Sequence, residues 1–78
     1  MVAISVHTFH EAGHVVTRVT IGASSIIRDQ TDMHTIVEVF RKDALPERYA
    51  FLATDNEHVS WIKLINLVNK ERGNHEHT

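Results

Sequence analysis

Two runs of residues with alternating polarity flank the segment Glu11-Ala12-Gly13-His14, and they match each other position by position. If the chain reverses at this segment, one face collects the pairs Ile4–Ile21, Val6–Val19, Thr8–Thr17 and His10–Val15. The other face is more polar and collects Ser5–Thr20, His7–Arg18 and Phe9–Val16. A shift by one residue would move every side chain to the opposite face, so the pattern predicts an antiparallel hairpin in one register. Gly13 supplies the positive φ that a four-residue hairpin loop usually needs.

The middle of the chain predicts further strands. We expect the second strand to continue past Gly22-Ala23-Ser24 to residue 28, with a bulge or bend at Gly22. Residues 29–32 have turn composition, and a third strand follows at about residues 33–41. Residues 42–47 fit a loop. Residues 49–53 fit either a fourth strand or a helical turn, and we favour the strand.

The C-terminal region predicts one amphipathic helix at about residues 55–72. A capping box at residues 54–57 marks its start, and Gly73 is placed as its stop. Its apolar stripe consists of Trp61, Leu64, Ile65 and Val68, broadened by Ile62 and Leu67. The predicted fold class is therefore α+β, an antiparallel meander of three to four strands with the C-terminal helix packed on one face. Residues 1–73 form this single domain, and residues 74–78 form a disordered polar tail.

The composition restricts the classes of function. A chain of 78 residues forms one domain, and its lack of cysteine excludes disulfides, thiol nucleophiles and cysteine-based zinc sites. It has neither a signal peptide nor an apolar run long enough for a membrane helix, so we expect a cytoplasmic protein that does not contact membranes. Eight basic residues are scattered among ten acidic ones, which argues against a nucleic-acid partner.

One segment has the wording of a catalytic motif. Residues 9–16 read Phe-His-Glu-Ala-Gly-His-Val-Val and contain the pattern H-E-x-x-H. On a helix, two histidines at this spacing share a face and hold zinc, and the glutamate activates the metal-bound water. The segment resembles the zinc-binding helix of FtsH-type membrane-anchored metallopeptidases, which also reads H-E-A-G-H after an aromatic residue and often has a glycine where Gly22 stands. The resemblance implies His10 and His14 as zinc ligands and Glu11 as the general base.

Local sequence favours the hairpin over a zinc-binding helix in this region. Residues 15–21 are almost entirely β-branched, and such residues favour strands. The family's third ligand is acidic, and Asp55, Glu57 and Glu76 are only guesses for it. A metal site without catalysis is a further hypothesis, in which the hairpin histidines are completed by His75 and His77 of the tail.

The uncovered face of the predicted sheet suggests a function. One helix shields one face, and the other face carries Phe9, Val16, Ile36 and Phe40 as interface candidates. A second copy of the chain is the simplest cover, so we predict a homodimer. The leading hypothesis is a non-enzymatic interaction module without a cofactor, which binds another protein in an accessory or inhibitory role. The alternative is a zinc-binding or degenerate metallopeptidase-like protein that uses His10, Glu11 and His14, and a nucleic-acid-binding sheet is the third hypothesis.

Overall fold

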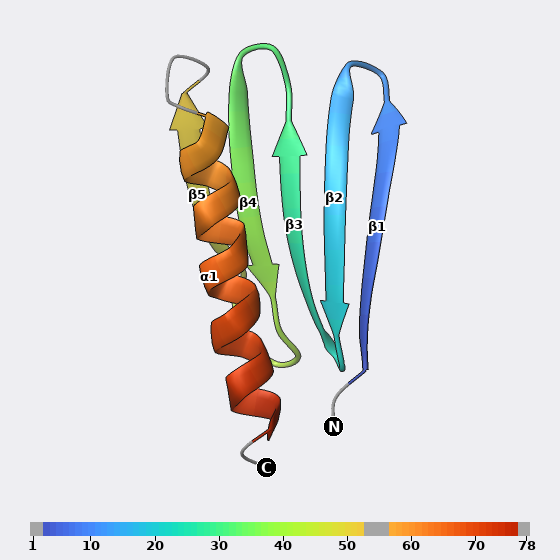
Figure 1. Ribbon diagram of the computed structural model, residues 1–78, viewed down its shortest axis with the longest axis vertical. Coiled ribbons are helices and arrows are strands. Elements are labelled where there is room, and N and C mark those ends of the chain that lie inside the picture. Colours follow the sequence, from blue (N-terminus) through green and yellow to red (C-terminus); the bar gives the residue numbers. More distant parts are fainter. Residues whose placement is uncertain (1–2, 53–56, 77–78) are drawn as a thin grey trace.

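The chain forms an antiparallel meander of five strands with one helix across a face of the sheet (Figure 1). The computed structural model describes residues 3–52 and 57–76. The elements are β1 (Ile4–Glu11), β2 (His14–Ile21), β3 (Ser24–Gln30), β4 (His34–Phe40), β5 (Glu47–Leu52) and α1 (Glu57–Glu76). Each strand pairs with the next one in the chain. The predicted α+β meander is confirmed, but it has five strands in place of three to four.

The first hairpin has the register that the alternating pattern predicts. β1 and β2 form every expected pair, and Glu11 pairs with His14 next to the turn. The two connecting residues, Ala12 and Gly13, have φ angles of 48° and 82°. Positive φ at both central residues is typical of a type I′ turn, whose twist matches that of the strands. Gly13 adopts this conformation freely, whereas an alanine there is strained by about 1–2 kcal/mol.

A second hairpin replaces the bend expected at Gly22. β2 ends at Ile21 and β3 begins at Ser24, so Gly22 and Ala23 form another two-residue turn. Gly22 has a φ of 57°, and Ala23 is not among the residues with positive φ, which is the φ pattern of a type II′ turn. The prediction of one continuous strand to residue 28 is therefore wrong. The strands expected at about 33–41 and 49–53 are confirmed as β4 and β5, with small shifts of their ends.

α1 packs on the sheet through one ridge of buried residues one helical turn apart, namely Ser60, Leu64, Leu67 and Glu71. The two leucines complete the hydrophobic core with Val19, Ile21, Ile26, Val37 and Val39. Burying each leucine contributes about 1.5–3 kcal/mol. Trp61 and Val68 are partly buried against this core, as the predicted stripe requires. Ile62 and Ile65 are 44% and 54% exposed, so their assignment to the buried stripe is wrong.

Polar contacts explain which side of α1 faces the sheet. Arg28 is fully buried on β3, and its Nε donates a 3.0 Å hydrogen bond to Ser60. Its guanidinium lies 4.0 Å from the centre of the Trp61 ring. At the other end of the helix, the hydroxyl of Ser24 donates to the buried carboxylate of Glu71 at 3.0 Å. These contacts direct Ser60 and Glu71 at the sheet, and they turn Ile62 and Ile65 outward.

Arg41 joins the C-terminal part of α1 to the edge of the sheet. Its guanidinium donates to Glu71 at 2.8 Å and also contacts Glu47. Glu47 accepts a second hydrogen bond from the hydroxyl of Tyr49. The hydrogen bond from Arg41 is the main reason that the pKa of Glu47 is lowered and the pKa of Arg41 is raised. This cluster holds β5 against α1.

The end of α1 differs from the prediction. The helix continues through Gly73 to Glu76, so the expected stop at Gly73 is wrong and residues 74–76 of the expected tail are helical. A single glycine in a helix costs only about 1 kcal/mol, which neighbouring helical residues tolerate. The expected capping box lies largely outside the described residues, as do residues 77–78. Within the described ranges, no helix is long and apolar enough to cross a membrane.

Two glycine substitutions with the same change in volume should have opposite effects on stability. Gly73→Ala should raise the free energy of unfolding by about 0.5 kcal/mol, because the helix gains propensity and nothing lies within 4 Å of the added Cβ. Gly13→Ala should lower it by about 1 kcal/mol, because φ at this position is +82°. Urea denaturation measures both values. A destabilising Gly73→Ala would contradict the helical assignment of residues 73–76.

The contribution of Glu47 should depend on pH. Because the pKa of Glu47 is lowered in the folded state, its stabilising effect is present above the ordinary value of 4.5 and is lost as the pH falls through the folded-state pKa. Glu47→Gln should therefore destabilise at neutral pH and matter progressively less below 4.5. Urea unfolding at several pH values measures the difference. The same substitution in an Arg41→Met background is the control, and a pH effect of equal size there would contradict the assigned cause.

Candidate functional site

The hairpin separates the residues of the H-E-x-x-H motif. His10 pairs with Val15 on the face of the sheet that α1 covers, which we call the helix-side face. Glu11 and His14 pair with each other and lie on the opposite face, which we call the open face. Because successive strand residues point to opposite faces, His10 and His14 do not converge as they would on a helix. The structure therefore does not bring the two candidate metal ligands together, and the zinc-binding helix that the resemblance implies is not formed.

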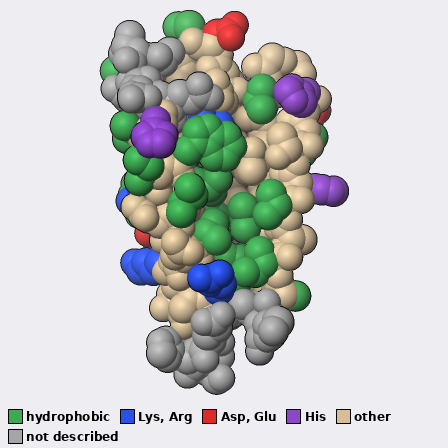
Figure 2. Space-filling model, in the orientation of Figure 1, with side chains coloured by type: hydrophobic (Ala, Val, Ile, Leu, Met, Phe, Trp, Pro, Cys, Tyr) green, Lys and Arg blue, Asp and Glu red, His purple; other side chains and the backbone are tan. Residues whose placement is uncertain are grey.

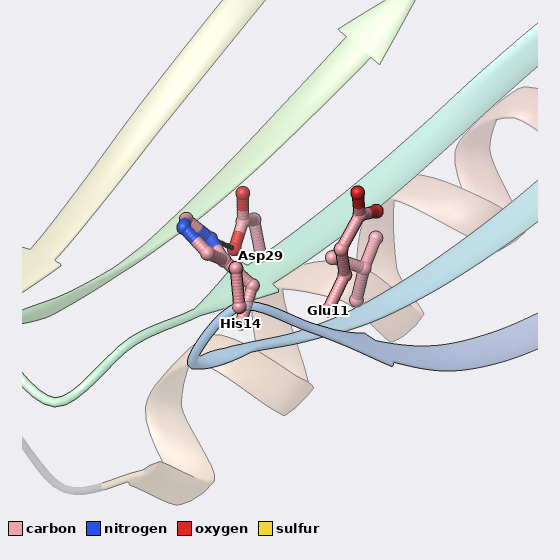
Figure 3. Close-up of a pocket in the computed structure, with 5 residues that line it drawn as sticks. Glu11, His14 and Asp29 are labelled. Carbon is pink, nitrogen blue, oxygen red and sulfur yellow. Dashed lines mark hydrogen bonds and ion pairs between the residues drawn. The ribbon is translucent and has the colours of Figure 1, made fainter.

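A shallow pocket of about 300 Å³ lies on the open face beside the first turn (Figure 3). It is lined by Glu11, Ala12, His14, Val16 and Asp29. His14 Nδ1 lies 2.7 Å from Asp29 Oδ1, and both side chains are substantially exposed. An exposed contact of this kind contributes only about 0–1 kcal/mol. It ties β2 to β3 at the wall of the pocket.

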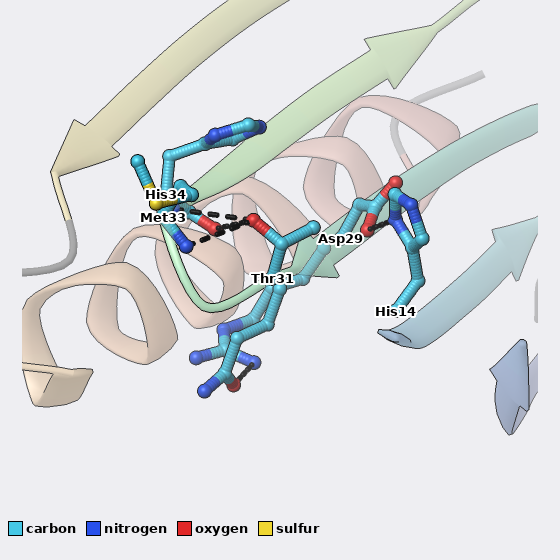
Figure 4. A network of polar contacts seen from close by, with 7 residues as sticks. His14, Asp29, Thr31, Met33 and His34 are labelled. Atoms are coloured by element: carbon cyan, nitrogen blue, oxygen red, sulfur yellow. Dashed lines mark hydrogen bonds and ion pairs between the residues drawn. The ribbon is translucent and has the colours of Figure 1, made fainter. Parts of the chain in front are cut away.

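Close to this pair, polar groups of Thr31, Met33 and His34 form hydrogen bonds with one another in the β3–β4 turn (Figure 4). The Thr31 hydroxyl accepts hydrogen bonds from the backbone N–H groups of Met33 at 3.3 Å and His34 at 3.2 Å. The Thr31 N–H donates to the His34 carbonyl at 2.8 Å. These contacts are those of a turn built by a threonine side chain. Among the side chains that the structure describes, no three of histidine, aspartate or glutamate are grouped so that they could hold a metal ion.

The metal site completed by the tail histidines involves side chains that the structure does not describe. His77 lies outside the described residues, and the side chain of His75 is not described. The same holds for Asp55 and for the side chains of Glu57 and Glu76, the acidic residues considered as a third ligand.

The four interface candidates lie on the open face, but only three of them share a row. Phe9 pairs with Val16, which pairs with Asp29, which pairs with Ile36 across four neighbouring strands. Phe9 is 37% exposed and Val16 is buried, so Phe9 and the half-buried Ile36 are the accessible apolar members. Phe40 pairs with Ser25 in a different row. Because Asp29 interrupts the apolar row, the open face is a mixed surface, and its use as an interface stays a prediction.

The helix-side face carries apolar side chains that the sequence pattern assigns to the core. β1 exposes Ile4 by 41% and Val6 by 64%, and α1 exposes Ile62 by 44% and Ile65 by 54%. Figure 2 shows hydrophobic side chains gathered at the centre of this face. A helix is about 10 Å wide and strands are about 4.8 Å apart, so one helix covers about two strands of a sheet. α1 packs on β3 and β4 and to a lesser extent on β2, and it leaves β1 uncovered. The alternating pattern predicts on which face of the sheet a side chain lies, but it does not predict over which strands the helix packs.

The outer edge of β1 is a second exposed surface in this part of the molecule. All eight residues of β1 are exposed, whereas every other strand has residues that are at least half-buried. β1 contains no proline or lysine, and its pairing with β2 has no bulge. These are the devices by which natural sheets protect their edges. β5, at the other edge, is two residues shorter, follows Pro46 and begins with Glu47 and Arg48.

Comparisons of this chain with protein-family models, curated proteins and solved structures found no match. The function of the chain has to be inferred from its own surfaces. Among the described residues these surfaces include the exposed edge of β1 and the exposed apolar residues around it.

The turn inside the motif offers a test of the hairpin. Ala12→Asn creates the Asn-Gly pair that type I′ turns prefer and relieves the strain of an alanine at φ 48°. The free energy of unfolding should rise by about 1 kcal/mol. If residues 10–14 formed a zinc-binding helix, the substitution would destabilise, because asparagine is a poorer helix former than alanine. Urea denaturation of the zinc-free protein separates the two outcomes by sign.

Proposed function

We propose that this protein is a non-enzymatic, homodimeric interaction module that binds an extended segment of another protein along the open edge of β1, in an accessory or inhibitory role. The observation that carries the proposal is the long, exposed and unprotected edge of β1. A strand added to such an edge gains main-chain hydrogen bonds, and its alternate side chains gain contacts on both faces.

The first turn determines which backbone groups of β1 are free to bind a partner strand. In a two-residue hairpin the residues that flank the turn, Glu11 and His14, are a hydrogen-bonded pair. Hydrogen bonding then alternates along the strand, so odd-numbered residues of β1 bond to β2 and even-numbered residues point outward. The hydrogen bond from Gly22 N–H to the Ala3 carbonyl, at 3.3 Å, agrees with this parity. Val6, Thr8 and His10 therefore offer their backbone groups at the edge.

The side chains around this edge give a bound strand contacts on both faces of the sheet. Phe9 lies on the open face and is 37% exposed, and Val6 lies on the helix-side face and is 64% exposed. A partner strand of alternating polarity would place apolar residues beside both of them. The proposed partner is therefore a protein segment with the same alternation as β1.

A proline at an outward-pointing position tests this proposal. Thr8→Pro removes a backbone donor at the edge without removing a hydrogen bond to β2, because Thr8 points outward. Thr8→Val keeps the donor and is the matched control. Peptides selected from a random phage-displayed library against the wild-type protein should be extended and alternating. Their affinity should fall by about tenfold or more for Thr8→Pro, since several main-chain hydrogen bonds are lost, and should persist for Thr8→Val.

Two results would contradict binding at the β1 edge. One is a library that yields no binders, and the other is a set of binders with equal affinity for the wild type and Thr8→Pro. Circular dichroism and urea unfolding of Thr8→Pro show whether β1 stays paired with β2. If Thr8→Pro unfolds, Val6→Pro repeats the test at the next outward-pointing position.

A further inference from the structure

The edge of β1 is complementary to β1 itself. The strand that suits this edge has the same alternation as β1, and a second copy of the chain presents such a strand with its backbone groups free. All eight residues of β1 are exposed, and its pairing with β2 has no bulge. β1 contains no lysine or arginine, and its one acidic residue, Glu11, is its last. Few charges therefore oppose the approach of two such edges.

Hydrogen-bond parity restricts how two β1 edges can pair. Antiparallel strands place residues opposite each other that have the same hydrogen-bonding role. The even-numbered residues of β1 point outward, so they must face even-numbered residues of the other copy. The register centred on His7 meets this condition, because it pairs Ile4 with His10 and Val6 with Thr8. Registers centred on Val6 or Thr8 also meet it, but they pair fewer of the described residues of β1.

We infer that two copies of the chain pair antiparallel along β1, around a two-fold axis at His7, and that this dimer blocks the edge at which the partner protein binds. The axis is perpendicular to the sheet, so the two sheets join into one and both helices lie on the same face. The inference rests on the proposed function and adds the regulation of the same site. The dimer has to dissociate before an extended segment of another protein can add to β1.

The rest of the fold leaves room for this pairing. α1 packs on β2, β3 and β4, so neither helix lies at the junction of the two copies. Figure 1 shows β1 and α1 at opposite sides of the sheet. In the register centred on His7, Glu11 lies opposite Ala3 of the other copy. The two glutamates are then about 27 Å apart, which is well beyond the screening length of physiological salt.

The contact between the two copies has the strength of an exchangeable interaction. The four outward-pointing residues of each copy form about eight main-chain hydrogen bonds across the junction. Because the contact involves one strand from each copy, it buries less than about 1,200 Å² in total, as transient complexes do. A dimer of this kind dissociates in the micromolar range, so a partner segment with better side-chain contacts displaces the second copy.

A single introduced cysteine tests the register. The chain has no cysteine, so the variant has one thiol per copy. His7 faces His7 of the other copy in a non-hydrogen-bonded pair, whose Cα atoms lie about 4.5 Å apart, within the range that a disulfide spans. Mild oxidation of His7→Cys should therefore give a covalent dimer. Ser5→Cys is the control, because its two thiols would lie about 14 Å apart and should not join.

Sedimentation velocity over a range of concentrations tests the surface that the dimer uses. The wild-type chain should dimerise reversibly. Thr8→Pro should raise the dimer Kd by about tenfold or more, because it removes a donor at the edge, whereas Thr8→Val should not. Val6→Pro repeats the test if Thr8→Pro unfolds. Ile65→Lys on α1 and Leu52→Glu on β5 change exposed side chains away from the edge and should leave the Kd unchanged.

The cross-linked dimer tests the competition with a partner protein. Oxidised His7→Cys should bind the peptides selected against the wild-type protein at least about tenfold more weakly than the reduced variant, because its edges are occupied. Reduction of the disulfide should restore binding. The reduced variant is measured below its dimer Kd, so that its own edge is free.

The outcomes separate this inference from the proposed function. A wild-type chain that stays monomeric up to about 1 mM overturns the inference and the homodimeric state, but leaves partner binding at the edge standing. A dimer that persists in Thr8→Pro overturns pairing through β1, and equal cross-linking of Ser5→Cys overturns the register. An oxidised dimer that binds peptides as well as the reduced variant overturns the competition. A library without binders overturns the proposed partner binding and the competition, while a cross-linked His7→Cys still supports the dimer.

Discussion

The contact of Leu64 and Leu67 with the middle of the sheet determines the rest of the structure. Within the described residues these are the buried apolar side chains of α1. A helix with two such anchors could sit at several positions on a five-stranded sheet. Arg28 fixes it at one end through Ser60 and Trp61, and Glu71 fixes it at the other. Because α1 is held over the middle of the sheet, the apolar side chains of β1 on the helix-side face remain uncovered. The open edge of β1 follows separately from the strand order, which places β1 at the end of the sheet.

Much of the fold could be predicted because local signals agree with it. The alternation on either side of Gly13 defines every pair of the first hairpin. The second hairpin could not be predicted in the same way, because Gly22 is followed by two small residues that continue a strand as readily as they end one. The positive φ of Gly22 decides between the two, and φ is not visible in the sequence. The passage of α1 through Gly73 depends likewise on its neighbours, because one glycine is a weak stop.

The candidate site was less predictable than the fold. The letters H-E-A-G-H are the same on a helix and on a hairpin, but a hairpin places His10 and His14 on opposite faces. The β-branched residues at 15–21 favour a strand, and they form β2 in the structure. The exposure of Ile62 and Ile65 could not be predicted, because hydrophobic periodicity does not reveal that a buried Arg28 draws Ser60 toward the sheet. Polar groups in the core set the rotation of the helix, and their partners come from distant parts of the chain.

The order of the strands has a consequence for folding. Each strand pairs with its neighbour in the chain, so most contacts join residues that are close in sequence and little loop entropy is lost before they form. Such a topology folds rapidly for a sheet protein. β1 is attached only to β2 and buries none of its side chains, so it can detach while the other four strands and α1 keep their core. Its amides should be the first of the sheet to exchange with solvent, which makes β1 the least stable cooperative unit of the molecule.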